Sequence, residues 1–405
     1  MVTYPEEWKS AQLSDLGYVQ MCRRIFHDQT KNNGTIPFYK ISTFGGVADA
    51  YISRELFEGY KSKYPYPQKG DILISTAGTI GKTVVFDGKD SYFQDSNIVW
   101  LKVDENLIDT DFLRWFYRSF PWKALEGTTI SRLYNSIILN TQIHIPPIYE
   151  QKMIAEVLRS FDDHIANLTE LIEKKKWIRD GALEDLLSGR RRMDGFDGEW
   201  GVYSFNDYFK FLPTNTFSRD HLSDIGKVGN IHYGDILIKY GNVLTARDNI
   251  PRLKDASKIN PKSYLQIHDV LIADTAEDET VGKVVQIGEV SIPLVGGLHT
   301  VACRPNYKTA TGFLGYYMNS ASYHNQLYPY ITGIKVSSVS KKSFGETELR
   351  IPVSVEEQEA IVDALTVMDE EIISLEAERN KIEKIREGAM DDLLTGRVRL
   401  PMEGE

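Results

Sequence analysis

Residues 150–192 read EQKMIAEVLRSFDDHIANLTELIEKKKWIRDGALEDLLSGRRR, and residues 357–399 read EQEAIVDALTVMDEEIISLEAERNKIEKIREGAMDDLLTGRVR. The two segments align without a gap, with Gln151 opposite Gln358 at an offset of 207 residues. Both copies close on Asp-Leu-Leu-(Ser/Thr)-Gly-Arg. Because each copy of a repeat must form the same structure, this duplication governs the organisation of the whole chain.

Apolar residues recur in both segments with the alternating four- and three-residue spacing of a coiled-coil seam. The seam residues are Ile154, Leu158, Phe161, Ile165, Leu168 and Ile172 in the first copy, and Ile361, Leu365, Met368, Ile372 and Leu375 in the second. A helix of about 38 residues would be about 57 Å long, more than a compact domain needs. Gly189 and Gly396 stand where C-terminal caps would end the helices. We expect the two seams to bury each other in an antiparallel coiled coil, which would relate the halves by a pseudo-twofold axis.

The segments in front of the two helices also resemble each other, although more faintly. Glu7-Trp8 matches Glu199-Trp200 at an offset of 192, and Gly81-Lys82 matches Gly282-Lys283 at an offset of 201. The offset between matching residues of the two copies therefore increases from the start of each copy towards its long helix. The second copy carries extra loop residues on a shared framework, so we expect the same fold with a different surface.

Short apolar runs separated by Gly, Asp, Asn and Pro predict strands and turns in these front segments, for example at Asp71–Ile74, Thr83–Phe86 and Val284–Ile287. Helices are predicted at Phe112–Arg118 and Phe313–Asn319, which occupy corresponding places in the two copies. The fold class is therefore α+β, with two duplicated α/β domains separated by the long helices. The expected division is a first domain over 1–148, a helical region over 149–193, a second domain over 194–353 and a second helical region over 354–405.

Composition indicates an ordinary folded protein with more than one core. The 405 residues are 42% hydrophobic and 26% charged, and the length exceeds what one core normally supports. The start of the chain lacks the features of a signal peptide, and no apolar run approaches the roughly 20 residues that span a bilayer. Cys22 and Cys303 are far apart in the sequence and are expected to be buried thiols in a reducing compartment. We therefore expect a soluble, cytoplasmic protein without membrane contact.

The formal net charge of −10 argues against nucleic-acid binding, because phosphate contacts need lysine and arginine. The argument weakens if the acidic residues lie on surfaces that face other subunits, which would leave local basic patches for DNA.

Motifs for catalysis and for metal or nucleotide binding are incomplete. The string Gly78 to Thr83 resembles a phosphate-binding loop, but Thr76 stands where that motif needs glycine, and in the second copy Val284 follows the lysine. The duplicated Gly-Lys is better explained as a turn between strands with a lysine available to a DNA phosphate. The prolines at 146–147 start a helix rather than an Asn/Asp-Pro-Pro-aromatic methyltransferase motif, because Ile145 precedes them. The eight histidines show no metal-ligand spacing and no catalytic triad.

Polar loops with basic residues occur at the same point of each copy, after Gly127 and after Gly333. Hydroxyl, amide and basic side chains suit phosphate contacts and hydrogen bonds to base edges. The candidate DNA-binding residues are Lys40, Thr76, Thr79, Lys82, Ser131, Arg132 and Tyr134 in the first copy, and Lys239, Thr275, Lys283, Lys335, Ser337, Ser338 and Lys341 in the second.

Over essentially its whole length, the chain resembles the specificity subunits of Type I restriction-modification enzymes. Three features carry the resemblance: the Pro-x-x-x-Glu-Gln helix start, the Asp-Leu-Leu-(Ser/Thr)-Gly-Arg helix end, and the Glu-Trp at the start of each half. The helix start is Pro146 to Gln151 in the first copy. The second copy departs from the pattern, because its single Pro352 stands further from Gln358.

The resemblance implies two target recognition domains, each reading one half of a split, asymmetric double-stranded DNA site. It also implies that the helices set the spacing between half-sites and dock two methylation subunits, which bring S-adenosylmethionine. Up to two restriction subunits would bring ATP hydrolysis and Mg²⁺, so this chain would hold no cofactor and no catalytic centre. No base-contacting residue carries over from the family, since its recognition domains vary too much.

Two other functions remain open from the residues alone. A structural coiled-coil adaptor would bind proteins without reading DNA. A nuclease or transferase with a diverged site in one half is disfavoured, because no chemically useful set of residues distinguishes one copy from the other.

Overall fold

The computed structural model describes residues 4–122, 132–333 and 335–401. The chain forms two compact units, the first made of Met1–Thr169 with Ala377–Glu405 and the second of Glu170–Glu376. Both boundaries fall inside the long helices α5 (Ile148–Leu187) and α11 (Val355–Thr395). Each helix therefore begins in one unit and ends in the other. The four-part division by sequence remains a prediction.

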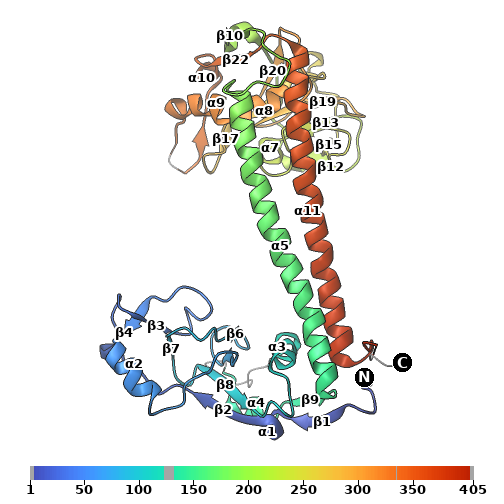
Figure 1. Cartoon of the computed structure of the whole chain (residues 1–405). Coiled ribbons are helices and arrows are strands. Elements are labelled where there is room, and N and C mark those ends of the chain that lie inside the picture. Colours follow the sequence, from blue (N-terminus) through green and yellow to red (C-terminus); the bar gives the residue numbers. More distant parts are fainter. Residues whose placement is uncertain (1–3, 123–131, 334, 402–405) are drawn as a thin grey trace. The chain divides into compact units, whose positions relative to one another are not determined.

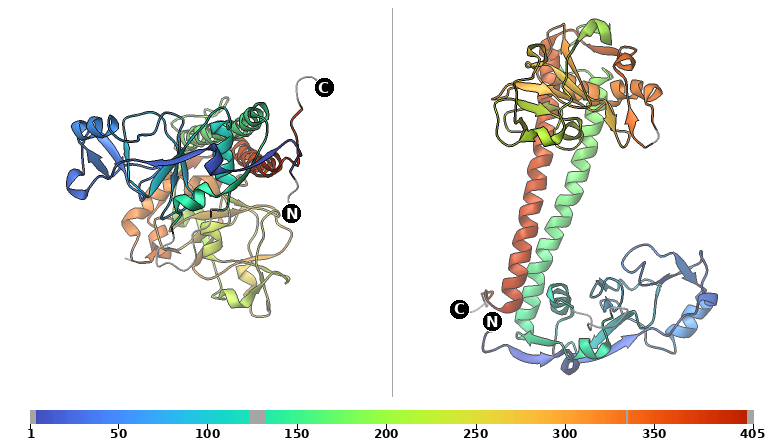
Figure 2. Two further views of the ribbon diagram at one scale, coloured as in Figure 1. Left: turned by 90° about the horizontal axis from the view of Figure 1, so that it is seen from below. Right: turned by 180° about the vertical axis from the view of Figure 1, so that it is seen from behind.

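The predicted pair of long antiparallel helices is confirmed. α5 has 40 residues and α11 has 41, and they lie side by side in both ribbon views (Figures 1 and 2). In the first unit, Arg386 of α11 donates to Asp162 of α5 at 2.7 Å. In the second unit, Arg179 of α5 lies 3.4 Å from Asp369 of α11. These two ion pairs correspond at the repeat offset of 207, so the duplicated sequence forms the same contact twice.

Each long helix ends at a glycine in the left-handed region. Gly189 and Gly396 have φ of +73° and +70°, and their N–H groups donate to the carbonyls of Leu186 and Leu393 at 3.3 Å. A side chain is strained at such a φ, which explains why both caps are glycine. The predicted caps are confirmed.

The first unit contains two main sheets, in the orders β2-β8-β5-β6 and β4-β3-β7, and a two-stranded pair β1-β9. Its strands are β1 (Lys9–Gln12), β2 (Gly17–Met21), β3 (Ile36–Tyr39), β4 (Ala50–Ile52), β5 (Ile72–Ser75), β6 (Thr83–Val85), β7 (Tyr92–Phe93), β8 (Ile98–Val103) and β9 (Gln142–Ile145). Its shorter helices are α1 (Leu13–Leu16), α2 (Arg54–Lys61), α3 (Thr110–Ser119) and α4 (Asn135–Leu139), with a 3-10 turn η1 (His27–Gln29).

The second unit contains sheets in the orders β11-β20-β16-β18-β14 and β12-β15-β13-β19, and the pairs β10-β22 and β17-β21. Its strands are β10 (Trp200–Ser204), β11 (Phe209–Leu212), β12 (Leu222–Ser223), β13 (Gly229–Ile231), β14 (Val243–Leu244), β15 (Arg252–Leu253), β16 (Val270–Ala273), β17 (Thr275–Ala276), β18 (Val284–Ile287), β19 (Leu294–Gly296), β20 (Thr300–Pro305), β21 (Ser337–Ser338) and β22 (Glu348–Pro352). Its shorter helices are α6 (Phe205–Tyr208), α7 (Tyr233–Ile238), α8 (Phe313–Asn319), α9 (Ala321–His324) and α10 (Lys341–Phe344), with 3-10 turns η2 (Arg219–His221), η3 (Pro261–Ser263) and η4 (Asn325–Tyr330).

The two units share one framework. The antiparallel order β2-β8-β5-β6 recurs as β11-β20-β16-β18, and the parallel pair β3/β7 recurs as β13/β19. The predicted helices α3 and α8 occupy corresponding places after β8 and β20. The predicted strands are found as β5, β6 and β18. The α+β class with two related domains is therefore confirmed.

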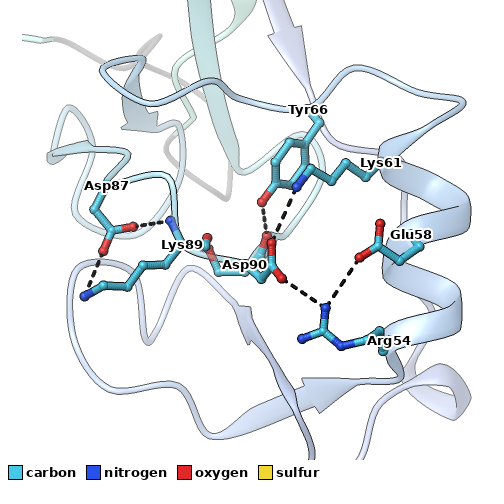
Figure 3. A network of polar contacts seen from close by, with 8 residues as sticks. Arg54, Glu58, Lys61, Tyr66, Asp87, Lys89 and Asp90 are labelled. Carbon is cyan, nitrogen blue, oxygen red and sulfur yellow. Dashed lines mark hydrogen bonds and ion pairs between the residues drawn. The ribbon is translucent and has the colours of Figure 1, made fainter.

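Helix α2 distinguishes the first unit, since only the short turn η3 lies between the corresponding strands of the second. Asp90 holds α2 to the loop after β6, because Arg54 lies 3.0 Å and Lys61 3.4 Å from its carboxylate (Figure 3). Beside this network, the Tyr66 hydroxyl donates to the carbonyl of Ser91 at 2.9 Å. The framework is thus constant while the additions to it differ.

The ends of the long helices complete the domain cores. Leu393 and Leu394 of α11 pack in the first core with Trp8 and Trp115, and Leu187 of α5 packs in the second core. Cys22 and Cys303 are both free and buried, as predicted, and burial raises the pKa of the Cys22 thiol to about 12. Each domain therefore depends on the C-terminal turns of the helix that begins in the other unit.

Candidate nucleic-acid interface

A buried glutamate at the start of each long helix holds an arginine that follows the other helix. The Arg399 guanidinium donates to both carboxylate oxygens of Glu150, at 2.6 and 2.9 Å. Arg192 binds Glu357 in the same way, at 2.6 and 2.7 Å. These hydrogen bonds raise the pKa of both arginines. Bidentate pairs of this kind are strong and directional. Each pair therefore holds the first turn of one long helix next to the segment that follows the other helix.

The glutamine beside each glutamate fixes the same helix start from within the domain. The Gln151 side chain donates to the carbonyl of Pro146 at 2.9 Å and accepts from the backbone N–H of Asp109 at 2.7 Å. Gln358 donates to the carbonyl of Pro352 at 2.8 Å and accepts from the N–H of Ala310 at 3.0 Å. The different proline spacing of the second copy therefore leaves these contacts unchanged.

The tryptophan of each Glu-Trp start packs on the glycine cap. A Cβ added to Gly189 would lie 3.3 Å from the Trp200 ring, and one added to Gly396 would lie 3.3 Å from the Trp8 ring. We call each such set of tryptophan, glutamate, glutamine, glycine and arginine a joint. The motifs at the starts and ends of the long helices therefore have a structural role in the joints.

Three loops meet in each domain through matching backbone hydrogen bonds. In the first unit, Thr76 donates its N–H to Asn97 at 2.9 Å and accepts from the N–H of Leu133 at 2.8 Å. In the second, Asp274 donates to His299 at 3.2 Å and accepts from Val339 at 2.9 Å. The loop after β5 or β16, the loop before β8 or β20, and the segment before α4 or α10 are therefore held together in both copies. Of the predicted polar loops, the described residues Leu133 and Val339 take part in this three-loop surface.

In the first unit, the three-loop surface joins Thr76 and Arg132 through one carbonyl. The buried Thr76 hydroxyl donates to Ser96 at 2.7 Å, and Arg132 donates to the same oxygen at 2.6 Å. Because Thr76 is buried and satisfied, it does not offer its hydroxyl to a base in this conformation. Tyr134 and Thr79 are exposed beside it. Ser131 lies outside the described residues.

The remaining candidates of the first unit are lysines with partners inside the protein. Lys82 lies in the loop between β5 and β6, as predicted for the duplicated Gly-Lys, and its ammonium donates to the carbonyl of Phe44 at 2.6 Å. Lys40 lies 2.8 Å from Asp49. These lysines are exposed or half-buried, so their charge still reaches the surface, but their positions are set by internal contacts.

In the second unit, the structure brings three candidates together on one short strand pair. Thr275 of β17 is opposite Ser338 of β21, and Ser337 is opposite Ala276. The Thr275 hydroxyl also lies 3.4 Å from Nδ1 of His299. Hydroxyls and an imidazole at the meeting point of three loops can donate to or accept from base edges. Lys335 and Lys341 are exposed on the adjoining segment.

The ammonium groups of Lys283 and Lys239 both lie at the C-terminal end of α7, a helix that contacts β17. The Lys283 ammonium donates to the carbonyls of Leu237 and Tyr240, at 3.0 and 3.3 Å, and its burial lowers its pKa. Lys239 lies 2.9 Å from the buried Asp235. Both lysines therefore neutralise acceptors of their own domain.

A basic and aromatic cluster of the first unit was not among the predicted site residues. Arg24 donates to Asp95 at 2.8 Å, and the Arg23 guanidinium lies 5.3 Å above the Tyr64 ring. With the exposed Phe26, these residues line a cavity of about 530 Å³. The string Arg23-Arg24-Ile25-Phe26 directly after a strand was the signal that could have revealed them.

Other chemistry finds no support in the part of the chain that the structure describes. There, no group of three or more His, Cys, Asp or Glu residues is placed to hold a metal ion. Nor is any helix of residues 4–122, 132–333 and 335–401 both long and apolar enough to cross a bilayer.

Comparison with known proteins gives one consistent family. Residues 5–175 and 198–384 match the Type I restriction modification DNA specificity domain. A putative type I restriction enzyme specificity subunit of Haemophilus influenzae is 54% identical over 162 residues, a match that spans 40% of this chain and 42% of that relative. The putative MjaX specificity subunit of Methanocaldococcus jannaschii is 24% identical and aligns with 98% of this chain and 95% of its own.

Solved structures show the same fold. The S subunit of a Type I restriction-modification system from M. genitalium superimposes with a TM-score of 0.54 at 16% identity, covering 98% of this chain and 96% of its own. A chain from a structure of an assembled type I restriction-modification system superimposes with a TM-score of 0.58 at 14% identity, covering 98% of this chain and all of its own.

Proposed function

The chain belongs to the family of Type I restriction-modification DNA specificity subunits, which are non-catalytic, and we propose that each of its domains reads one half of a bipartite, asymmetric DNA site. The observation that carries the proposal is the three-loop surface, which the same backbone contacts build in both domains from different side chains. A duplicated scaffold with two different polar surfaces suits a DNA site whose two halves differ in sequence.

Domain exchange tests this assignment. Replacing residues 1–148 by a related domain, with the chain expressed beside its methylation subunit, is expected to change one half of the methylated motif and leave the other half intact. Methylome sequencing reads out the motif. Exchange of residues 194–353 is the matched control and should change only the opposite half. If no motif depends on this chain, the adaptor function replaces the reader.

The two long helices offer the same outward position twice. Ile178 of α5 and Ile385 of α11 correspond at the offset of 207, and their side chains are 50% and 43% exposed. A singly exposed isoleucine is common on protein surfaces, but its repetition at the same position of both helices supports a contact that is made twice. We propose that each position docks one methylation subunit, and that up to two restriction subunits complete the assembly.

The partners would supply the cofactors. S-adenosylmethionine would be held by the methylation subunits, and ATP and Mg²⁺ by the restriction subunits, while this chain recognises the DNA sequence. Because its substrate is cellular and invading DNA, we place the complex in the cytoplasm.

The acidic net charge predicts that DNA affinity belongs to the assembled complex rather than to the chain alone. With about six phosphate contacts, raising the salt concentration from 50 to 200 mM should lower the affinity of the complex about a thousandfold. Fluorescence anisotropy with a motif duplex measures this, and the isolated chain, with its charge of −10, should bind weakly at both concentrations. An affinity of the complex that ignores salt would contradict the model.

A further inference from the structure

We propose that Phe26 stacks on a base step of the first half-site while Arg23 and Arg24 hold the phosphates on either side. The inference rests on the proposed function, since it assumes that the first domain contacts duplex DNA. It goes further by naming an aromatic contact that distorts the duplex, and thereby a residue that determines specificity.

The position of Phe26 is fixed although its ring is in solvent. The side chain is 58% exposed, which forgoes the gain of burying an aromatic ring. Its backbone N–H donates to the Gln29 side chain at 2.9 Å, and its carbonyl accepts from the N–H of Gln29 at 3.0 Å. The Thr30 hydroxyl closes the turn on the carbonyl of His27 at 2.8 Å. The turn η1 therefore fixes the backbone from which the ring projects, which lowers the part of the entropic cost that a mobile loop would add to a contact.

Two guanidinium groups beside the ring are available to phosphates. Arg24 is oriented by Asp95 at 2.8 Å, yet 59% of its side chain is exposed. Arg23 lies over Tyr64, which restrains a second guanidinium nearby. Phe26, Arg24 and Asp95 line both the cavity of about 530 Å³ and a neighbouring one of about 330 Å³, so the ring stands at their common rim. Exposed guanidinium N–H groups beside an exposed ring match phosphates beside a base step.

The second domain carries the same turn with different residues. Turn η2 corresponds to η1 at an offset of 192, and the N–H of His221 donates to Ser218 at 3.0 Å just as Gln29 donates to Phe26. Ser218 thus occupies the place of Phe26, and Asn215-Thr216 replaces the two arginines. The chain itself shows that this backbone accepts a serine, and that the two domains differ at this position.

An inserted ring can select sequence without a hydrogen bond to a base. Wedging an apolar side chain between bases unstacks them, and the cost depends on how deformable the step is. We therefore expect Phe26 to favour a flexible step within the half-site read by the first domain.

The test uses the assembled methylation complex and Phe26→Ser, with Phe26→Trp as the conservative variant. Tyr18→Ser is the matched control, because Tyr18 is 60% exposed on β2 of the same domain and lines neither cavity. The motif is first found by methylome sequencing with the unaltered chain. Duplexes with 2-aminopurine at each position of the first half-site then report unstacking by fluorescence, and a thermal melt checks folding.

We expect one 2-aminopurine position to brighten with the unaltered chain and with Phe26→Trp, and to stay dark with Phe26→Ser. Affinity for the motif duplex should fall about tenfold in Phe26→Ser, the size of one base–aromatic stacking contact. Unchanged fluorescence, affinity and motif in a folded Phe26→Ser complex would overturn the stacking role while leaving the domain assignment intact. Absence of any motif with the unaltered chain would instead overturn the proposed function.

Discussion

Replacing Arg399 by alanine is expected to destabilise the first domain by about 3 kcal/mol and to leave the second domain unchanged. The substitution leaves the carboxylate of Glu150 buried without its partner, and removing one member of a buried ion pair costs several kcal/mol. Because Arg399 lies beyond α11, the variant would show that the far end of the chain secures the domain at its beginning. Differential scanning calorimetry should show one transition lowered by about 6 to 12 °C.

The repeat supplies the mirror experiment. Arg192→Ala should lower the other transition instead, because Arg192 forms the same bidentate pair with Glu357. Arg397→Ala is the control, since Arg397 is exposed and its ion pairs among the described residues are with Asp391 and Asp392 at the end of its own helix. If Arg399→Ala lowered both transitions equally, or neither, the joints would not be the local clamps that their geometry implies.

Periodicity made the helices predictable. The four- and three-residue spacing from Ile154 to Ile172 predicts a helix with one apolar face, and the end of each helix followed from a glycine, which tolerates φ near +70°. The partners of that face were not predictable: Ile154 and Leu158 pack in the first core with Leu393 and Leu394, and Ile361 and Leu365 pack in the second core. Short apolar runs likewise predicted strands such as β5 and β18, because the local pattern of apolar residues decides which residues are buried.

The binding surface was less predictable, because it depends on which backbone groups come near a side chain. Lys283 was chosen as a phosphate ligand, yet its ammonium caps the carbonyls of Leu237 and Tyr240, more than forty positions away. The Thr76 hydroxyl donates in the same way to the carbonyl of Ser96, twenty positions away. Phe26 was missed since an isolated phenylalanine is normally core, and only the turn η1 shows that it faces solvent.

The family motifs and the proposed DNA surface also lie in different places. Glu150, Gln151 and Gly396 have identical counterparts in the other copy because they build a joint, and the geometry of a joint tolerates little change. The hydrogen bonds that the three-loop surfaces of the two domains share are backbone to backbone, and different side chains can accompany them. A resemblance that rests on the residues of the joints can therefore identify the family, but it does not indicate which DNA bases the chain recognises.

Gly181 and Gly388 lie inside the two long helices at corresponding positions. Replacing both by leucine is expected to remove the methylation subunits from the complex. Glycine in a helix interior costs about 1 kcal/mol relative to alanine. Within residues 4–122, 132–333 and 335–401 nothing requires glycine there, because a Cβ at either position would meet no atom within 4 Å and neither residue has a positive φ. Each glycine follows the exposed Ile178 or Ile385 by three residues, on the same side of its helix. A close approach by a partner explains both features.

Alanine at these positions is expected to have opposite effects on the stability of the isolated chain and on assembly, which tests whether a partner approaches the glycines. Gly181→Ala with Gly388→Ala should stabilise the isolated chain by about 1 to 2 kcal/mol in total, yet weaken assembly, whereas the leucine pair should abolish it. Native mass spectrometry counts the methylation subunits: each single leucine variant should lose one, and the double variant both. Asp180→Ala with Glu387→Ala alters the preceding positions, which point to another side of each helix, and should keep both subunits. Full assembly of the double leucine variant would mean that the glycines face no partner, and the docking surface would then have to be sought on another side of α5 and α11.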